Sequence, residues 1–297
     1  MILAVDIGGT KIAAARVDRN GALASVVVET PTPAHEGPQS VVRAAVGLLD
    51  RLRTPDDVAV AVSTAGVVDS SRGVILAATS SIPNWAGTLL ADLVTARTGL
   101  PTWVLGDGNA FGLGLSAEHG AASLVALIAG TGIGGSFVVE GEPRFGAHHV
   151  GGHFGHLPSP QAAGMPCPCG SVGHLEGVAS GHGILAWYRQ HGGDSAVRST
   201  LELTRRTTDE TALLALTTGG AALGGAAAGL ANALDPDLVV ISGSIARAGD
   251  PWESAVKAAY AQTLIPALAD TPLTISTRGA AVALVGAAAY ATRKMNT

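Results

Sequence analysis

Apolar residues along the chain gather in short runs that end in glycine and small polar residues. Ile2–Val5 is such a run, and Asp6 with a Gly-Gly-Thr-Lys turn separates it from a second run, Ile12–Val17. The same order recurs where Leu124–Ala129 is followed by a glycine-rich turn and then by Phe137–Val139. Each copy is typical of strand, turn and strand, and two copies roughly 120 residues apart indicate an internal duplication.

The two turns, DIGGTK at 6–11 and GTGIGG at 130–135, favour anion binding. Glycine lacks a Cβ, so backbone amides can converge on a phosphate without obstruction, and Lys11 adds a positive charge. The pattern differs from the P-loop, whose GxxxxGK[ST] leads into a helix. For either turn alone, an ordinary β-hairpin is the alternative. A third candidate is the small-residue turn 242–244 after the apolar run Asp237–Ile241, and two such turns from two domains would hold a nucleotide's phosphates.

The remaining segments alternate between strand-like and helix-like patterns, as expected of an α/β protein. Apolar residues at helical spacing predict a helix over 36–53, and strands are expected at Val58–Val62, Ile75–Thr79 and Thr102–Leu105. Further helices are expected at Leu89–Thr98, Ala110–Glu118, Gly177–Gln190, Asp209–Leu216, Gly219–Leu234, Pro251–Ala269 and Ala280–Arg293.

Asp107 follows the predicted strand Thr102–Leu105 within the sequence Gly-Asp-Gly-Asn. Ligands of open α/β sheets bind at the carboxyl ends of the strands, so an aspartate at this position is a candidate for chemistry. The alternative is structural, because aspartate is also a common N-cap residue of helices.

Composition and charge exclude several classes of protein. The chain has 297 residues, 40 glycines, 47% hydrophobic and 14% charged residues, which fits two compact domains rather than disorder. A net charge of −5 without any Lys/Arg run argues against a nucleic-acid or membrane-surface partner. The N-terminus does not resemble a signal peptide, and the Ala/Gly-rich run 221–234 is interpreted as a packed helix of a soluble protein. The only two cysteines stand one residue apart, which suits a reducing cytoplasm.

The stretch 151–177 combines metal-binding residue types with a glycine- and proline-rich, non-periodic sequence. It contains both cysteines, Cys167 and Cys169, and one carboxylate, Glu176. Four of the nine histidines lie in or beside it, at positions 149, 153, 156 and 174. Soft and borderline ligands gathered this closely indicate a metal site with a polar site next to it.

With these residues in view, the chain resembles the ROK family of repressors and sugar kinases, within the actin-like superfamily. The matching pieces, in order, are DIGGTK at 6–11, STAGVVD at 63–69, IPNW at 82–85, GDGNA at 106–110, GTGIGG at 130–135, GH at 155–156, CPCGSVGHLE at 167–176 and DPDLVVISG at 235–243. The resemblance implies an α/β fold with duplicated actin-like (ribonuclease H-like) domains and a ligand cleft between them. A smaller domain would comprise 1–105 and 284–297, and a larger domain with the zinc and sugar sites would comprise 106–283.

The resemblance also implies an activity, which is transfer of the γ-phosphate of ATP to a hexose hydroxyl, most often O6. Asp107 matches the family's catalytic aspartate, and Asp6 would help to hold Mg²⁺. Nucleotide contacts are implied for Asp6, Gly8, Gly9, Thr10, Lys11, Thr131, Gly132 and Gly243. Sugar contacts are implied for Gly66, Gly106, His153, His156 and Glu176, and structural Zn²⁺ ligands for His156, Cys167, Cys169 and His174. A cytoplasmic homodimer is expected, with no nucleic-acid or membrane partner.

Three positions depart from the family pattern. The third metal cysteine of CGxxGCxE is His174 here, which still leaves a Cys₂His₂ set, and a metal-free loop is the alternative. The Glu of GExGH is His153, and the Asn before the catalytic Asp is Gly106. Those two family residues hold the middle of the sugar ring, around the 3-hydroxyl. Losing a partner for a buried hydroxyl costs about 1–3 kcal/mol, so glucose should bind less well than in a family glucokinase.

Three interpretations of these departures remain open. The first is a kinase for a sugar altered near C3, such as 3-amino-3-deoxyglucose (kanosamine). The second is a glucose-type kinase with altered contacts and modest activity, and the third is a sugar-binding sensor without efficient catalysis. A repressor is not expected, because its DNA-binding helices precede the DIGGT turn and only five residues precede Asp6 here.

Overall fold

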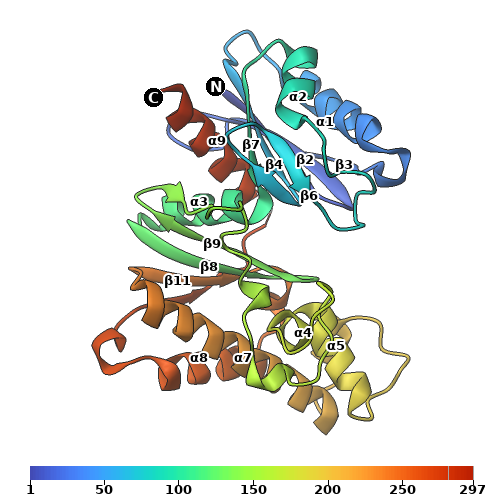
Figure 1. Cartoon of the computed structure of the whole chain (residues 1–297), viewed down its shortest axis with the longest axis vertical. Helices are drawn as coiled ribbons and strands as arrows, with labels where there is room; N and C mark the ends of the chain where they lie inside the picture. Colours follow the sequence, from blue (N-terminus) through green and yellow to red (C-terminus); the bar gives the residue numbers. More distant parts are fainter. Residues whose placement is uncertain (280, 297) are drawn as a thin grey trace. The chain divides into compact units, whose positions relative to one another are not determined.

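The structure is a computed structural model that describes residues 1–279 and 281–296, and its contacts divide the chain into two compact units. Unit 1 comprises Met1–Ala122, Val138–Gly151 and Gly279–Thr297, and unit 2 comprises Ser123–Phe137 and Gly152–Arg278. Each unit is organised around one five-stranded sheet (Figure 1). The domain boundaries that the resemblance implies, after residue 105 and before residue 284, stay a prediction.

The sheet of unit 1 has the strand order β3-β2-β1-β4-β7. Its strands are β1 (Ile2–Ile7), β2 (Lys11–Val17), β3 (Val28–Pro31), β4 (Ala59–Thr64) and β7 (Thr102–Gly106). β1, β4 and β7 are mutually parallel, whereas β2 is antiparallel to its neighbours. Parallel strands are covered on both faces, which is why every residue of β4 is buried.

Helices cover both faces of this sheet, and alternate residues of β1 therefore pack into two different hydrophobic cores. Leu3 and Val5 pack with the apolar faces of α1 and α2, whereas Ile2 and Ala4 pack with α3 and α9. The bounds of these helices are α1 (Pro38–Leu52), α2 (Leu90–Thr98), α3 (Asp107–His119) and α9 (Ala281–Met295). α3 begins directly where β7 ends, and this junction places Asp107 at the edge of the sheet.

The sheet of unit 2 has the order β10-β9-β8-β11-β12, in which β8, β11 and β12 are parallel. Its strands are β8 (Ser123–Ala129), β9 (Ile133–Val139), β10 (Glu142–Pro143), β11 (Leu238–Ser242) and β12 (Leu273–Ile275). Its helices are α4 (Glu176–Ala179), α5 (Gly181–Gln190), α6 (Thr200–Leu203), α7 (Glu210–Leu234) and α8 (Trp252–Thr263). The remaining elements are a two-stranded ribbon, β5 (Val67–Asp69) and β6 (Val74–Ala77), and the short 3₁₀ helices Ala34–Glu36, Phe154–His156, Pro160–Ala162, Ser244–Arg247 and Pro266–Leu268.

The two strand–turn–strand units predicted from the glycine turns are confirmed as β1–β2 and β8–β9. The predicted strand after Gly130–Gly135 starts earlier, at Ile133, so the turn itself is shorter. The helix predicted from Ala110 also starts earlier, at Asp107, which is the first helical residue rather than the N-cap. The strands β3, β5, β10 and β12 were missed because each has only two to four residues.

Four predicted helices had wrong boundaries. The two helices predicted over 209–216 and 219–234 are one continuous helix, α7. The helix predicted over 177–190 is divided at Ser180, whose hydroxyl accepts a hydrogen bond from the Gly183 N–H and so caps α5. The helix predicted over 251–269 ends at Thr263, ahead of the proline of the helical turn Pro266–Leu268. The helix predicted over Ala280–Arg293 corresponds to α9, and its predicted first residue, Ala280, lies outside the described residues.

α7 is, within the described residues, the one helix long and apolar enough to cross a membrane by length and composition. Half of its most apolar window is buried inside unit 2, and its small residues pack closely against α8. A Cβ on Gly224 would collide with the backbone carbonyl of Val256. These contacts confirm the interpretation of 221–234 as a packed core helix.

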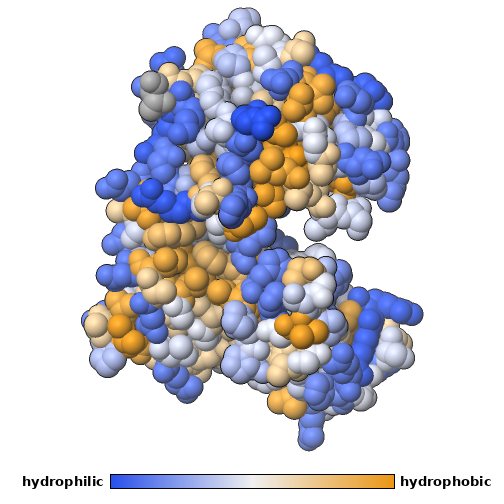
Figure 2. Space-filling model, in the orientation of Figure 1, coloured by the Kyte–Doolittle hydropathy of each residue, from blue (hydrophilic) through white to orange (hydrophobic). Residues whose placement is uncertain are grey.

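Polar and apolar residues are interspersed over the face shown in Figure 2. Several large apolar side chains are exposed, among them Leu76, Val172, Leu201 and Leu214. Single exposed apolar residues of this kind are normal on globular proteins and require no partner.

The close approach of α7 and α8 leads to a test with a matched control on the same helix. Gly224→Ala should lower the free energy of unfolding by about 1–3 kcal/mol, because overpacking outweighs the gain in helix propensity. Gly229→Ala should instead raise it by about 0.5–1 kcal/mol, because Gly229 is exposed and a Cβ there meets nothing within 4 Å. Thermal unfolding followed by circular dichroism distinguishes the two, and equal stabilisation by both substitutions would contradict the packing described.

Candidate functional site

Two carboxylates lie at the carboxyl end of the parallel strands of unit 1. Asp6 is the partner of Ser63 in the β1–β4 register, and the Ser63 hydroxyl donates to Asp6 Oδ1 at 2.6 Å. Asp107 is exposed at the start of α3. Burial raises the pKa of the Asp6 carboxyl to about 6, against the Ser63 hydrogen bond, and the charge of Asp107 raises it further. A buried carboxylate near a second carboxylate would be stabilised in its ionised form by a divalent cation.

The glycine turn of unit 1 is held by backbone and hydroxyl contacts. The Gly8 N–H donates to the Lys11 carbonyl at 3.1 Å, and Thr32 binds both Gly8 and Thr10 through its hydroxyl and its N–H. A Cβ on Gly9 would lie 2.8 Å from the Ser81 Cβ, so only glycine fits there without a shift. The Lys11 ammonium pairs with Glu29 at 2.6 Å, and both side chains are about half exposed. The nucleotide contacts implied for residues 8–11 stay a prediction.

Gly66 and Gly106 are neighbours in the structure, but their backbones have different requirements. Gly66 has φ 113°, and a Cβ on it would lie 2.8 Å from the Ala77 carbonyl oxygen, so this position requires glycine. A Cβ on Gly106 would lie 3.4 Å from the Gly66 carbonyl oxygen, an ordinary van der Waals contact. A Cβ therefore fits at position 106 without a clash with the backbone.

The glycine turn of unit 2 is supported by Glu176. The Ile133 N–H donates to Glu176 Oε2 at 2.6 Å, and a Cβ on Gly132 would lie 2.5 Å from the same oxygen. The Gly181 N–H, at the start of α5, donates to the Gly130 carbonyl at 2.8 Å. Gly243, with φ 100°, lies against the Ala129 backbone at the end of β8. The structure thus brings together four residues with implied ligand contacts, namely Thr131, Gly132, Glu176 and Gly243, around one turn.

The four predicted zinc ligands form a cluster in unit 2. The candidate ligand atoms of His156, Cys167, Cys169 and His174 all lie within 4.8 Å of one another. Cys167 Sγ lies 3.5 Å from His156 Nδ1, and Cys169 Sγ lies 3.3 Å from His174 Nδ1. Tetrahedral zinc with sulfur and nitrogen ligands spaces these atoms about 3.5 Å apart, so the donor set and its spacing fit the ion.

Backbone hydrogen bonds hold the loop around the two thiols. The Cys167 N–H donates to the Ser171 carbonyl at 2.8 Å, and the Gly170 N–H donates to the Cys167 carbonyl at 2.9 Å. Burial raises the pKa of the Cys167 thiol, whereas the Ser171 N–H lowers the pKa of the exposed Cys169 thiol. The two cysteines therefore differ in environment although only one residue separates them.

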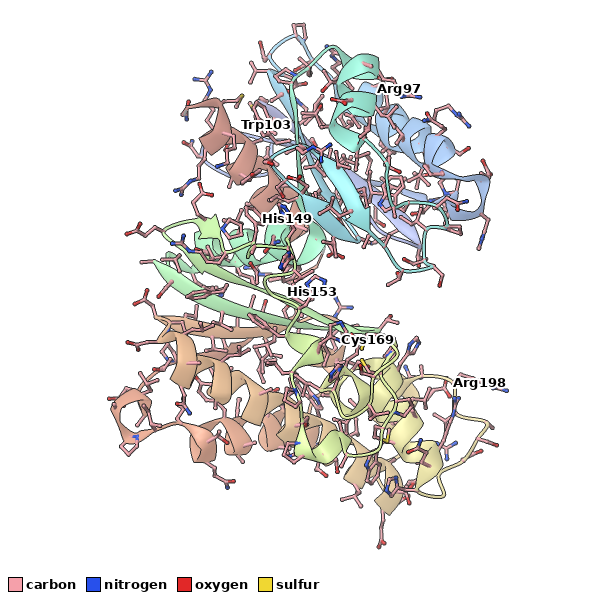
Figure 3. All side chains as sticks on the ribbon, viewed as in Figure 1. Arg97, Trp103, His149, His153, Cys169 and Arg198 are labelled. Atoms are coloured by element: carbon pink, nitrogen blue, oxygen red, sulfur yellow. The ribbon has the colours of Figure 1, made fainter. Side chains whose placement is uncertain are left out.

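His153 is exposed and lies directly before the 3₁₀ helix that carries His156 (Figure 3). The two imidazole rings are stacked with their centroids 6.1 Å apart. His153 is not one of the four clustered ligands. His153 therefore lies beside His156, which is one of the predicted zinc ligands.

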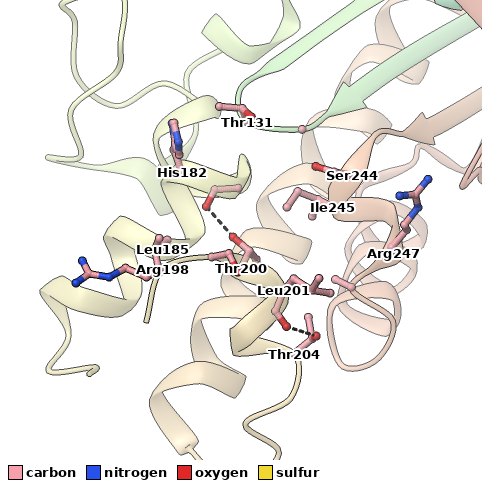
Figure 4. Close-up of a pocket in the computed structure, with 14 residues that line it drawn as sticks. Thr131, His182, Leu185, Arg198, Thr200, Leu201, Thr204, Ser244, Ile245 and Arg247 are labelled. Atoms are coloured by element: carbon pink, nitrogen blue, oxygen red, sulfur yellow. Dashed lines mark hydrogen bonds between the residues drawn. The ribbon is translucent and has the colours of Figure 1, made fainter. Parts of the chain in front are cut away.

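A pocket of about 320 Å³ opens beside the glycine turn of unit 2 (Figure 4). Its lining comes from the turn, from the start of α5, from the segment around α6 and from the 3₁₀ helix after β11. The lining residues are Gly130, Thr131, Gly181, His182, Leu185, Arg198, Ser199, Thr200, Leu201, Thr204, Ser244, Ile245, Arg247 and Ala248. Of this lining, the sequence predicted the glycine turn with Thr131 and the small-residue turn that contains Ser244.

The segment around α6 was missed, although one signal for it is present in the sequence. Ser199 and Glu202 have the sequence spacing of a capping box, and the Glu202 N–H donates to the hydroxyl of the N-cap Ser199, while the Glu202 carboxylate accepts from the N–H of Arg198, one residue before the N-cap. The Thr200 hydroxyl donates to the Gly181 carbonyl at 2.8 Å and ties this segment to α5 (Figure 4). The pocket therefore has two arginines, Arg198 and Arg247, together with the apolar side chains of Leu185 and Ile245.

Comparison with solved structures defines the fold class. A ROK hexokinase from Thermus thermophilus matches with a TM-score of 0.84 and 30% identity over 99% of both chains. A ROK family glucokinase from Streptomyces griseus, solved with glucose and AMPPNP, matches with a TM-score of 0.79 and 28% identity over 99% of both chains. The protein thus has the actin-like, two-domain fold of the ROK sugar kinases.

The family follows from the sequence comparisons. The ROK family model matches residues 2–294. A glucokinase from Halalkalibacterium halodurans is 30% identical over 95% of this chain and 92% of its own length. The match to the glucokinase of Streptomyces coelicolor, at 34% identity, covers 64% of this chain and 59% of that protein, which is less than two thirds of its length. The chain belongs to the ROK family, as its motifs indicated.

Because the pKa of Asp6 is raised, the substitution Asp6→Asn should stabilise the folded protein by an amount that depends on pH. The folded-state pKa of about 6 exceeds the unfolded value, so the folded protein loses stability as pH rises from about 4 to above 6, by up to about 3 kcal/mol. Asparagine still accepts from Ser63 but carries no charge, so the variant should unfold at a higher temperature than the wild type near neutral pH and at a similar temperature near about pH 4. A difference in melting temperature that stays constant with pH would contradict this account.

The thiol–imidazole cluster predicts one zinc ion per chain. Cys167→Ser and His174→Ala should each abolish or strongly reduce the zinc content measured by elemental analysis, and should lower the melting temperature, because the ligand loop loses its shared ion. His153→Ala is the matched control, since His153 lies beside the cluster without belonging to it, and this variant should keep its zinc. Zinc-free wild-type protein, purified without chelators, would refute the assignment.

Proposed function

We propose that the protein is an ATP-dependent hexose kinase, which transfers the γ-phosphoryl group of ATP to O6 of glucose or of a modified glucose. The observation that carries the proposal is the carboxylate pair of unit 1, with Asp107 exposed at the start of α3 and coupled to the partly buried Asp6. The family membership and the glucose- and AMPPNP-bound structure of the Streptomyces griseus relative support the same reaction. A ROK transcriptional regulator shares the fold at 22% identity, so the fold alone does not decide the function.

In the proposed reaction Asp107 is the general base. Its exposed carboxylate accepts the proton of the sugar hydroxyl as the oxygen attacks the γ-phosphorus, and the bond from that phosphorus to the bridging oxygen of ADP breaks. Phosphoryl transfer depends mainly on positioning and on neutralisation of charge. Mg²⁺, bound with ATP, would supply that neutralisation. Asp6 is the side chain of unit 1 suited to hold it, because its ionised form is destabilised by burial until a cation approaches.

Unit 2 contributes the nucleotide and sugar contacts of the proposal. The pocket beside Gly130 and Thr131 offers backbone amides and two arginines for phosphates, and the side chains of Leu185 and Ile245 for an apolar base. The carboxylate of Glu176 holds the same turn in shape. The zinc-ligand loop would fix His156, which is proposed to contact the anomeric side of the sugar.

The acceptor is proposed to differ from glucose near C3, with kanosamine as the candidate, or to be glucose bound with fewer contacts. Gly106 supplies no side chain where the backbone leaves room for one, and His153 is an imidazole where the family has a carboxylate. A neutral imidazole can accept a hydrogen bond from an amine, although a carboxylate would suit an ammonium better. A coupled assay of ADP release over a panel of hexoses and amino sugars decides between them, and a higher kcat/KM for glucose rules out the amino sugar.

Asp107→Asn should lower kcat by about 10²–10⁴-fold while sugar binding, measured by calorimetry, changes little. Asp50→Asn is the matched control, because Asp50 is an exposed aspartate near the end of α1, away from the strand ends. Unchanged turnover in Asp107→Asn would remove this residue from the mechanism. Sugar binding without any turnover in the wild type would favour the sensor interpretation.

The double variant Gly106→Asn/His153→Glu should raise kcat/KM for glucose by about 5–100-fold, because two hydrogen-bonding groups are restored to the middle of the ring. Each single variant should give part of this gain. Zinc content serves as the control for His153→Glu, since the substitution lies beside a metal ligand. No gain for glucose in the double variant would show that these two positions do not limit glucose binding.

A further inference from the structure

A second cavity, of about 370 Å³, lies within unit 1 and takes no part in the proposed reaction. Four segments far apart in sequence line it, namely the end of the β5 strand, β7, the loop after β10 and α9. The lining residues are Ser70, Ser71, Trp103, Phe145, His149, Tyr290 and Lys294. Its size and its aromatic walls fall within the range of small-molecule sites.

Two polar atoms of this lining are buried without a hydrogen-bond partner. They are the hydroxyl oxygen of Ser70, a residue that is only 7% exposed, and Nδ1 of His149. Leaving such groups unsatisfied costs free energy, and native structures rarely do so without a reason. Two orphaned groups on the wall of one cavity therefore indicate a ligand that hydrogen-bonds to both.

His149 is also held in an unusual backbone conformation, with φ 59°. Residues other than glycine adopt the left-handed region only when their surroundings fix them there, and such positions cluster at binding sites. Asp69 Oδ1 lies 4.0 Å from His149 Nε2, which is beyond hydrogen-bond distance and does not fix the tautomer of the imidazole. A ligand that can both donate and accept hydrogen bonds therefore suits Nδ1.

The charges around the cavity are compensated. Asp69 accepts hydrogen bonds from the Ser71 hydroxyl and from the N–H groups of Ser71 and Arg72. The Lys294 ammonium lies 3.8 Å from the carboxylate of Glu142 and 5.2 Å from the centre of the Tyr290 ring. A neutral ligand therefore suits the cavity better than an ion.

We propose that this cavity is a second small-molecule site, which takes a neutral polyhydroxylated ligand of monosaccharide size. Hydroxyl groups can donate to His149 Nδ1 and can either donate to or accept from Ser70. The C–H faces of such a molecule pack against the rings of Trp103, Phe145 and Tyr290, which form the walls (Trp103 and His149 are labelled in Figure 3). The proposal does not depend on the kinase reaction.

The test follows the indole signal of Trp103 by NMR in the full-length protein, with ¹⁵N-labelled tryptophan and with Trp103→Phe to assign the signal among the four tryptophans. The probes are D-glucose, D-mannose, D-galactose and myo-inositol, each titrated to about 100 mM so that millimolar binding is detected. A saturable shift of the Trp103 signal with at least one probe is expected. No saturable shift with any of the four would overturn the proposal.

Substitutions of Ser70 and His149 test whether the shift of the Trp103 signal depends on the two polar atoms that have no hydrogen-bond partner. Ser70→Ala and His149→Gly should each raise the Kd of the probe that binds by about tenfold or more, because each removes one hydrogen-bonding group. His149→Asn should bind within about threefold of the wild type, because asparagine tolerates the left-handed region and keeps an acceptor oxygen. Equal binding by the wild type, Ser70→Ala and His149→Gly would refute the site even if the signal shifts.

Two further measurements separate this proposal from the kinase proposal. Ser70→Ala without ligand should have an unchanged or higher melting temperature, because it removes a buried hydroxyl that has no partner. Glu176→Gln should impair phosphorylation and leave the Trp103 titration unchanged. If the Trp103 shift is lost together with turnover in that variant, the signal reports the reaction site and the second site is refuted.

Discussion

The candidate site of unit 1 depends on the burial of one carboxylate, Asp6, near a second carboxylate, Asp107, at the carboxyl end of the parallel strands. Asp6 is the next-to-last residue of β1, Asp107 follows β7, and β4 between them contributes Ser63. Burial raises the pKa of Asp6, and the charge of Asp107 adds to that effect. The core on both faces of the sheet holds the pair in place, so the folded protein maintains an arrangement that a cation would stabilise.

Unit 2 connects its ligand loop to its glycine turn through a short segment of chain. His174 belongs to the thiol–imidazole cluster, and Glu176, two residues later, accepts the hydrogen bond from Ile133 that shapes the turn. A displacement of His174 can therefore shift Glu176, which lies two residues later at the start of α4 and holds the glycine turn. The predicted metal site and the glycine turn beside the proposed nucleotide pocket are therefore connected through two residues of chain.

The sequence predicted those parts of the fold and the site that have a local signature. The strand–turn–strand units, the family and the four clustered residues all follow from motifs. α7 was predicted as two helices, over 209–216 and 219–234, whereas it is continuous, and its residues Gly219 and Gly220 are buried where neighbouring elements approach closely. The cavity of unit 1 could not be predicted, because Ser70, Trp103, His149 and Tyr290 are distant in sequence and no periodic pattern connects them.

Gly66 and Gly106 look equivalent in the sequence, and only the structure separates them. A side chain at position 66 would be opposed both by a positive φ and by the Ala77 carbonyl, so that glycine is fixed by the fold. A Cβ at position 106 meets neither restriction, because its nearest neighbour, the Gly66 carbonyl oxygen, lies 3.4 Å away. Of these two glycines, only Gly106 therefore accepts a Cβ without backbone strain, so the proposed change of sugar preference is assigned to position 106 and not to position 66.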